Sequence, residues 1–348
     1  MNQLAISAIA VGFVAAAASG ATRAAPAYQL TILPSTIPGA PAGDIAGVDA
    51  INNVGQLLFS VSAPGSTFED ASYLYSTVTH SYTLLPNDPT ALPGSTYYSG
   101  LNDNDQFVGY YQPTTLGTYQ SFLQSGGIFT NVTPPASYQT DFSNAVDLND
   151  AGQIVGSWEL SSGNEQGYEL SGGTYTTIDI PPFPGTATFP EDINSSGVIV
   201  GLYGPIPGGS SPLSGFEDVG GVITDIADQG QLSTEPLAIN DSGEIVGLVS
   251  NDPNQVTGEG FVDIAGNLTT FVAPAAILTA LYGVNDLGQI IGSATEADGT
   301  GYSFLLTPTA IPEPAAWAMM LVGLGGLGVG LRSSRRRPLD GAPAATRG

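Results

Sequence analysis

The stretch INDSGEIVG, residues 239–247, is one of six similar phrases in this chain of 348 residues. The others are INNVGQLLF (51–59), LNDNDQFVG (101–109), LNDAGQIVG (148–156), INSSGVIVG (193–201) and VNDLGQIIG (284–292). Successive asparagines of the phrase lie 45 to 50 residues apart. A repeat of this length is typical of a four-stranded sheet, the blade of a β-propeller. The phrase therefore predicts a body built from six similar sheets.

Each copy of the phrase predicts a strand, a tight turn and a return strand. The asparagine begins a type I turn, where its side-chain oxygen can accept a hydrogen bond from the backbone two residues on. The glycine three residues later adopts the positive φ of a hairpin with a bulge; Asp105 replaces it in the second copy. The predicted turn residues are Asn52, Asn102, Asn149, Asn194, Asn240 and Asn285, with Gly55, Gly152, Gly197, Gly243 and Gly288.

Two more strands are expected after each turn, an aromatic-led third strand and a fourth strand rich in Thr, Ile and Val. The sixth copy lacks the fourth strand, because Phe304 leads directly to Pro308. The segment YQLTILP (28–34), at the other end of the body, has the missing pattern. We therefore predict an all-β fold over residues 26–308, a six-bladed β-propeller closed by its N-terminal strand. The alternative is an open solenoid, which needs caps rather than closure.

The six phrases also resemble the HAF repeats of bacterial extracellular proteins, whose Asn-Asp-x-Gly-x-Ile-Val-Gly core is similar. The resemblance covers about residues 48–307. It implies a repeat architecture and no particular activity.

Charge and composition exclude several classes of function. The chain has 31 acidic and 6 basic residues and a formal net charge of −25, and residues 26–310 contain neither lysine nor arginine. Such a body repels nucleic acids and anionic lipids. It has no cysteine, and its single histidine, His80, cannot make a multi-histidine zinc site. A lone histidine between strands is expected to lie in an exposed turn.

The N-terminal residues predict a signal peptide at 1–25 with a helical apolar core. Leu4 to Ala18 form an apolar run, with Ser7 as its one polar residue, and small residues follow it. The segment departs from the usual pattern because no Lys or Arg precedes the run. A buried N-terminal helix is the alternative.

The C-terminal residues predict a transmembrane helix at 315–331. Ala315 to Leu331 are 17 apolar residues, enough for a helix of about 25 Å. Arginines follow at once, as they do on the cytoplasmic side of a membrane segment. We expect membrane contact through this helix only.

Residues 309–337 closely resemble the PEP-CTERM sorting signal, and 338–348 form a short additional tail. The matching residues are Pro312, Glu313, Pro314, Trp317, Arg335, Arg336 and Arg337. The resemblance implies an exported protein of an exopolysaccharide-producing Gram-negative bacterium, and an exosortase, a membrane protease, as partner. It implies an inner-membrane anchor during sorting, followed by the periplasm, outer membrane or cell surface.

No cofactor is predicted, although calcium is a weak candidate. Asp147, Asn149, Asp192 and Asn194 resemble the start of a calcium loop, but the fifth ligand position and the closing Glu do not match. The alternative is turn chemistry alone.

Aromatic residues just after the phrase offer candidate glycan contacts, and exopolysaccharide is the candidate partner. They are Tyr110, Tyr111, Trp158 and Tyr203. Packing between blades is the alternative explanation.

The prediction for function is an exported structural or binding protein at the cell surface, not an enzyme. The alternative is a carboxylate-dependent glycan hydrolase or lyase on the propeller scaffold. The adjacent pairs Glu191-Asp192 and Glu217-Asp218 are expected in solvated turns and edges. A partly desolvated carboxylate pair from different blades, at the mouth of the central funnel, would favour the enzyme.

Overall fold

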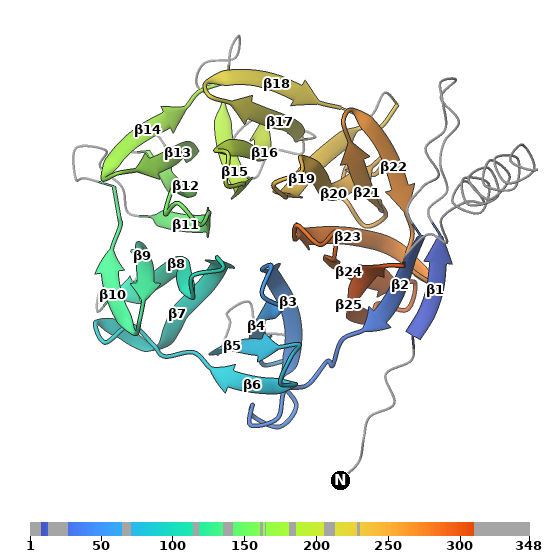
Figure 1. Ribbon diagram of the computed structural model, residues 1–348, viewed down its shortest axis with the longest axis horizontal. Coiled ribbons are helices and arrows are strands. Elements are labelled where there is room, and N and C mark those ends of the chain that lie inside the picture. Colours follow the sequence, from blue (N-terminus) through green and yellow to red (C-terminus); the bar gives the residue numbers. More distant parts are fainter. Residues whose placement is uncertain are drawn as a thin grey trace, which may run out of the picture. The chain divides into compact units, whose positions relative to one another are not determined.

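The computed structural model describes residues 8–12, 27–64, 71–113, 118–134, 142–160, 163, 165–180, 186–204, 213–227 and 230–309. Their strands form six antiparallel sheets arranged radially around a central axis (Figure 1). In the first five sheets the strands follow chain order from the axis outward, and in the sixth β23, β24 and β25 are followed by β2 and β1. The predicted all-β propeller with six blades is confirmed.

The blades have the following strands. The first contains β3 (Ile45–Ile51), β4 (Gln56–Ser62), β5 (Ala71–Ser76) and β6 (Ser81–Leu84). The second contains β7 (Ala91–Leu101), β8 (Gln106–Pro113), β9 (Gln120–Ser125) and β10 (Ile128–Asn131). The third contains β11 (Ser143–Leu148), β12 (Ile154–Glu159), β13 (Glu165–Ser171) and β14 (Thr174–Ile178). The fourth contains β15 (Ala187–Ile193), β16 (Val198–Gly204), β17 (Ser214–Val219) and β18 (Val222–Ile226). The fifth contains β19 (Ser233–Ile239), β20 (Glu244–Ser250), β21 (Glu259–Ile264) and β22 (Asn267–Phe271). The sixth contains β23 (Ala276–Val284), β24 (Ile290–Glu296) and β25 (Gly301–Pro308), followed by β2 (Ala27–Ile32) and β1 (Ala8–Gly12).

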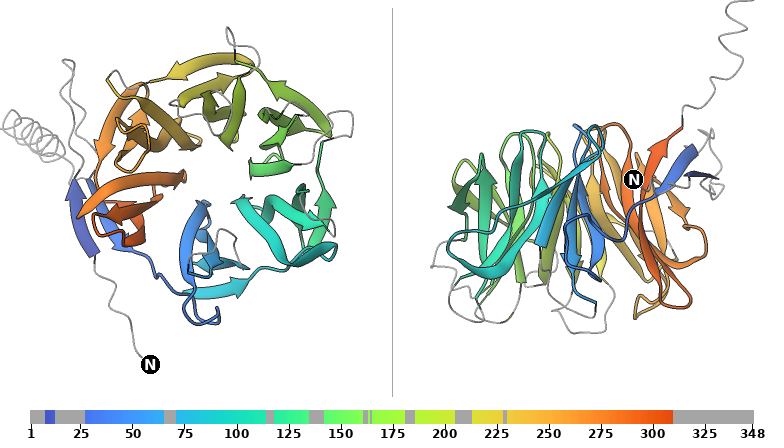
Figure 2. Two further views of the ribbon diagram at one scale, coloured as in Figure 1. Left: turned by 180° about the vertical axis from the view of Figure 1, so that it is seen from behind. Right: turned by 90° about the horizontal axis from the view of Figure 1, so that it is seen from below.

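The sixth blade is completed by the start of the body, as the displaced fourth strand predicts. β2 pairs antiparallel with β25, from Tyr28 opposite Pro308 to Ile32 opposite Phe304. Leu30 faces Leu306 in this register, and both side chains are fully buried. First and last strands of the body therefore share one core, and the circle of sheets is closed (Figure 2).

The helix expected in the N-terminal apolar run is not present in its described part. Residues 8–12 form strand β1, which pairs antiparallel with β2 from Ala8 opposite Thr31 to Gly12 opposite Ala27. A continuous apolar run has no periodicity that separates strand from helix. The outer edge of β2 offers unpaired backbone groups, which favours a strand there. The other residues of the predicted signal peptide lie outside the described residues.

The C-terminal predictions also lie outside the described residues. They comprise the sorting residues from Pro312 to Arg337 and the helix at 315–331. The chain divides into two compact units, Met1–Pro308 and Thr309–Gly348. Within the described ranges, no helix has the length and apolar character needed to cross a membrane.

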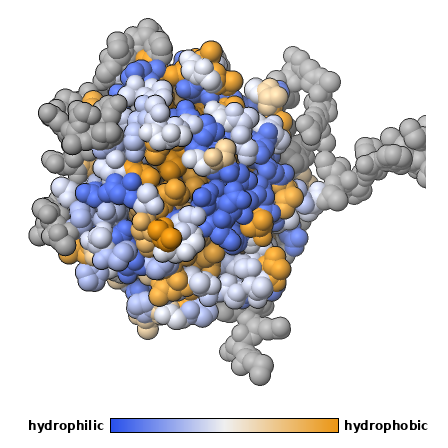
Figure 3. All heavy atoms as spheres, turned by 60° about the vertical axis from the view of Figure 1, so that its left-hand side comes forward, coloured by the Kyte–Doolittle hydropathy of each residue, from blue (hydrophilic) through white to orange (hydrophobic). Residues whose placement is uncertain are grey.

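The core lies between neighbouring blades and along their middle strands. The aromatic residue that begins each third-strand pattern is buried in every blade: Tyr73, Phe122, Tyr168, Phe216, Phe261 and Phe304. Clusters join adjacent blades; one includes Val246 of the fifth and Phe304 of the sixth. The outermost strands are more exposed, and polar and apolar residues intermix on the outer face seen in Figure 3.

Candidate functional site: the axial pocket

A closed circuit of asparagine side chains holds the six innermost turns together. The Asn52 Nδ2 donates a hydrogen bond to the carbonyl oxygen of Asn102 in the next blade at 3.1 Å. The same bond recurs at every step around the ring, with distances of 2.9 to 3.2 Å. The last bond runs from Asn285 back to Asn52. Each blade is thus fixed to its neighbour through one repeated residue.

The same asparagines organise their own turns. Asn240 Oδ1 accepts the backbone N–H groups of Ser242 at 3.1 Å and Glu244 at 2.9 Å. Gly243 has φ +76°, a conformation that glycine adopts without a steric penalty. The other four predicted turn glycines have φ between +69° and +80°, and Asp105 has φ +54°.

Every innermost strand carries a β-bulge three residues before its asparagine. Around the bulge in β15, Pro190 faces Gly201 and Asp192 faces Val200, so Glu191 has no partner in the strand register. In five blades the bulge sits against the last glycine of the phrase, where there is no room for a side chain, and in the first blade Phe59 takes the place of this glycine. A Cβ on Gly247 would lie 1.9 Å from the carbonyl oxygen of Glu235. The six residues skipped by the register are Asp49, Ser99, Val146, Glu191, Leu237 and Tyr282.

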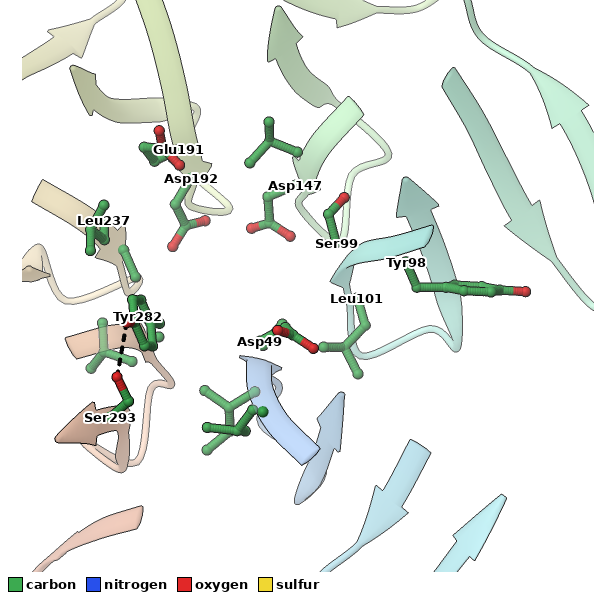
Figure 4. A pocket seen from close by; sticks show the side chains of 18 of the residues that line it. Asp49, Tyr98, Ser99, Leu101, Asp147, Glu191, Asp192, Leu237, Tyr282 and Ser293 are labelled. Carbon is green, nitrogen blue, oxygen red and sulfur yellow. Dashed lines mark hydrogen bonds between the residues drawn. The ribbon is translucent and has the colours of Figure 1, made fainter. Parts of the chain in front are cut away.

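All six bulge residues line one pocket on the axis, with a volume of about 490 Å³. Figure 4 shows their side chains around the central space. A bulge redirects a side chain from the sheet face, and these are half-buried or, for Tyr282, 38% exposed. The copies stop resembling one another at this position, where they carry two acids, a serine, two aliphatic residues and a tyrosine.

One wall of the pocket holds two carboxyl groups from adjacent blades. Asp147 of β11 and Asp192 of β15 point toward each other (Figure 4). Asp192 accepts backbone N–H groups from Ile193 at 2.6 Å and from Ile239 of the fifth blade at 2.8 Å. Burial, the negative charge of Asp192 and a shared hydrogen bond raise the pKa of Asp147 well above its usual value. Asp147 therefore carries the proton that the pair shares.

A third carboxyl group, Glu191, lies beside this pair. Burial, followed by the charges of Glu235, Asp192 and Glu165, raises the pKa of Glu191 to about 8. Burial also raises the pKa of Glu235 and of Glu165, although hydrogen bonds from nearby polar side chains act against it. Glu191 is therefore largely protonated at neutral pH.

Aromatic side chains line the parts of the pocket formed by the second and sixth blades, and Asp49 belongs to the first blade between them. Tyr110 of β8 lines the pocket, and its ring stacks on Tyr97 of β7 with centroids 4.9 Å apart. Tyr119 and Phe142 pack against Tyr110 at 5.7 and 6.3 Å. Tyr282 of β23 contributes a hydroxyl that is hydrogen-bonded to Ser293 at 2.9 Å. The pocket thus joins an acidic wall to a wall of aromatic faces and hydroxyls.

Two of the four calcium candidates, Asn149 and Asn194, make hydrogen bonds within their own turns. The side-chain oxygens of Asn149 and Asn194 each accept backbone N–H groups of their own turns. Asp147 and Asp192 point toward each other from adjacent blades (Figure 4). Over the described ranges, no group of three or more acidic or histidine side chains is placed to hold a metal ion. Turn chemistry therefore explains Asn149 and Asn194, and calcium binding at Asp147 and Asp192 stays a prediction.

The four candidate glycan-contact residues do not share a surface. Trp158 is fully buried and stacks on Tyr168 at 5.0 Å. Tyr111 and Tyr203 are also buried, and their hydroxyls donate to Gln120 and Asp225. Only Tyr110 reaches the axial pocket among these four. Adjacent residues of a strand face opposite sides, so Tyr110 and Tyr111 separate.

The acidic pairs and the histidine are placed differently from one another. Glu191 and Asp192 face the pocket, not a solvated turn as expected. Glu217 and Asp218 lie on β17, away from the axis. His80 is exposed in the turn between β5 and β6, where its Nδ1 lies 3.1 Å from the Tyr75 hydroxyl.

Comparison with known proteins identifies the C-terminal segment. Residues 310–337 match the PEP-CTERM protein-sorting motif, which is a recognition signal for exosortase processing. This confirms the predicted sorting signal and implies export to the cell envelope. No curated protein matches the chain. The similarity of the body to HAF repeats stays a prediction.

Several solved structures share low similarity with the chain. A prolyl endopeptidase matches with a TM-score of 0.49 and 12% identity, covering 83% of this chain and 47% of that one. The chain thus spans about half the length of that protein. A Trypanosoma rangeli sialidase matches with a TM-score of 0.45 and 12% identity, covering 88% and 59%. An Aleuria aurantia lectin matches with a TM-score of 0.35 and 11% identity, covering 83% and 90%. At this level of similarity these proteins say nothing about the ligand of the axial pocket.

Proposed function

We propose that this chain is a saccharide-binding protein of the bacterial cell envelope, with the axial pocket as its binding site. The ring of six bulge residues carries the proposal. The turns, glycines and buried aromatics repeat in the blades, because the same geometry is needed six times. The bulge residues differ, which is what an asymmetric ligand on the axis requires.

The chemistry of the pocket fits a hydroxyl-rich ligand. Carboxyl groups and hydroxyls can donate and accept hydrogen bonds to sugar hydroxyls. Tyr110 offers a ring face to the apolar face of a sugar. A volume of about 490 Å³ lies within the range of small-molecule sites. The sorting motif and the acidic body favour an exopolysaccharide of the producing cell as the source of this ligand.

A glycan array probed with the full chain tests the proposal. We expect binding to a defined set of saccharides. Tyr110→Leu should weaken binding about tenfold because it removes the ring face at the pocket wall. Tyr282→Leu should act in the same direction.

The matched control is Tyr302→Leu, in β25, because Tyr302 packs beside Phe304 and does not line the pocket. Unchanged binding by both pocket variants, with all variants folded, would contradict the proposed site.

One observation favours the second candidate function, a glycan hydrolase. Glu191 is protonated near neutral pH and lies in a pocket with other carboxyl groups, as a general acid requires. Asp49, from the first blade, would serve as its partner. The test is release of reducing ends from glycans identified on the array. Activity that Glu191→Gln abolishes, while binding persists, would support the enzyme.

A further inference from the structure

The axial pocket is chemically polarised. Figure 4 shows Glu191, Asp192 and Asp147 on the third and fourth blades and Asp49 on the first. Tyr110 and Tyr97 of the second blade also line the pocket. A ligand that occupies the pocket therefore meets a group of three carboxyl groups on the third and fourth blades, an aromatic ring on the second blade and a single carboxyl group, Asp49, on the first. This arrangement fixes which end of a ligand lies where.

Within the part of the chain that the structure describes, no group supplies a positive charge to this site. Residues 26–310 contain neither lysine nor arginine, and His80 lies in an outer turn of the first blade. The described side chains also contain no metal-binding group of three or more acids or histidines. The carboxyl groups can therefore be neutralised by protons or by an organic cation that enters the pocket.

We propose that the saccharide bound in the axial pocket carries a protonated amine, placed beside Glu191 and the Asp147–Asp192 pair, with its sugar ring against Tyr110. The ligand class is an amino sugar. This inference rests on the proposed saccharide-binding function and adds the position and charge of one substituent.

The physical reason is exchange of a proton for an ammonium group. Without ligand, mutual repulsion and burial keep protons on Glu191 and on the aspartate pair. An ammonium group placed among them favours the ionised carboxylates, so binding releases protons. It also makes charge-assisted hydrogen bonds, which are about twice as strong as neutral ones. A neutral sugar would gain neither effect.

Calorimetry on the full chain distinguishes binding of an amino sugar from binding of a neutral sugar. The measurement is made at about pH 6, where glucosamine is charged and Glu191 is protonated. The probes are glucosamine, N-acetylglucosamine, glucose and butylamine. We expect glucosamine to bind at least about tenfold more tightly than either uncharged sugar. Glucosamine should show proton release and the two uncharged sugars should show none, measured as a dependence of the heat on the ionisation enthalpy of the buffer.

The outcomes distinguish this inference from the proposed function. Equal binding of glucosamine and glucose would overturn the amine position and leave the saccharide-binding function standing. Butylamine binding as tightly as glucosamine would overturn the contact of the ring with Tyr110. A failure of all sugars here and on the glycan array would overturn both proposals.

Two variants assign the effect to the acidic wall. Glu191→Gln and Asp192→Asn should each reduce the preference for glucosamine over glucose at least about fivefold and reduce proton release. Glu217→Gln is the matched control because it changes an acid of the same blade outside the pocket. A preference unchanged in both pocket variants, with their folding verified by circular dichroism, would overturn the inference.

Discussion

The side-chain nitrogen of Asn285 donates a hydrogen bond to the carbonyl oxygen of Asn52 at 3.1 Å, across a sequence separation of 233 residues. This bond completes the circuit of six asparagines at the axis. The pairing of β2 with β25 completes the circle again in the outer part of the sixth blade. The propeller is therefore closed twice: by side-chain hydrogen bonds near its axis, and by backbone pairing between β2 and β25 farther from the axis.

The asparagine circuit predicts a large loss of stability when one member is removed. Asn285→Ala leaves the buried carbonyl of Asn52 and the N–H groups of Leu287 and Gln289 without these partners. We expect the free energy of unfolding to fall by about 2–3 kcal/mol, as is typical when buried polar groups are left unsatisfied. Denaturant titration of the full chain measures it.

Asn267→Ala is the control, because Asn267 is exposed at the start of β22 and its side chain donates to the carbonyl oxygens of Ile264 and Ala265 in the adjoining turn. Its effect should stay below about 0.5 kcal/mol. Equal losses for the two variants would contradict a special role of the axial circuit.

Closure by β2 gives a second prediction. Leu30→Ala removes a fully buried side chain opposite Leu306 and should destabilise the protein by about 2–5 kcal/mol. Gln29→Ala, on the exposed face of the same strand, should change stability little. Thermal unfolding of both variants would show the difference, and a neutral Leu30→Ala would speak against closure through this strand.

The repeated architecture can be predicted from sequence because it depends on local rules. The spacing of the asparagines sets the blade size, and the turn geometry follows from Asn and Gly at fixed positions. Closure is also predictable, because the pattern of YQLTILP (28–34) is the one that the sixth copy lacks. Residues 8–12 form a strand where a helix is expected. An apolar run has no hydrophobic periodicity that separates the two, and pairing with β2 then decides its conformation.

The pocket residues are harder to predict because a bulge changes the phase of a strand. Adjacent residues of a regular strand face opposite sides, so Glu191 and Asp192 could not both line one pocket. The bulge lets both do so. One signal was available: the position three residues before each asparagine varies, while the flanking phrase repeats. Whether the side chain at that position points toward the axis depends on the strand register, which cannot be read from the sequence.

The irregular turn of the second blade gives a third prediction. Asp105 has φ +54° where the other copies have glycine, and its carboxylate accepts only an exposed hydrogen bond from Gln56. Asp105→Gly should raise the free energy of unfolding by about 0.5–1 kcal/mol because it relieves backbone strain. The reverse change, Gly152→Asp, should lower it. Denaturant midpoints test both, and destabilisation by Asp105→Gly would mean that the bond to Gln56 outweighs the strain.

The axial carboxyl groups predict that stability falls as pH rises. Folding raises the pKa of Asp147 well above its usual value and that of Glu191 to about 8. The folded state therefore binds more protons than the unfolded state between about pH 4 and these raised values. This stabilisation is complete below the unfolded pKa values and is lost as pH rises through the folded ones.

The melting temperature should thus be lower at about pH 8.5 than at about pH 5.5. Glu191→Gln and Asp147→Asn should raise it at the higher pH and flatten the profile, because neither replacement ionises. Glu217→Gln should leave the slope unchanged; a slope that no pocket variant alters would show that other carboxylates cause the loss.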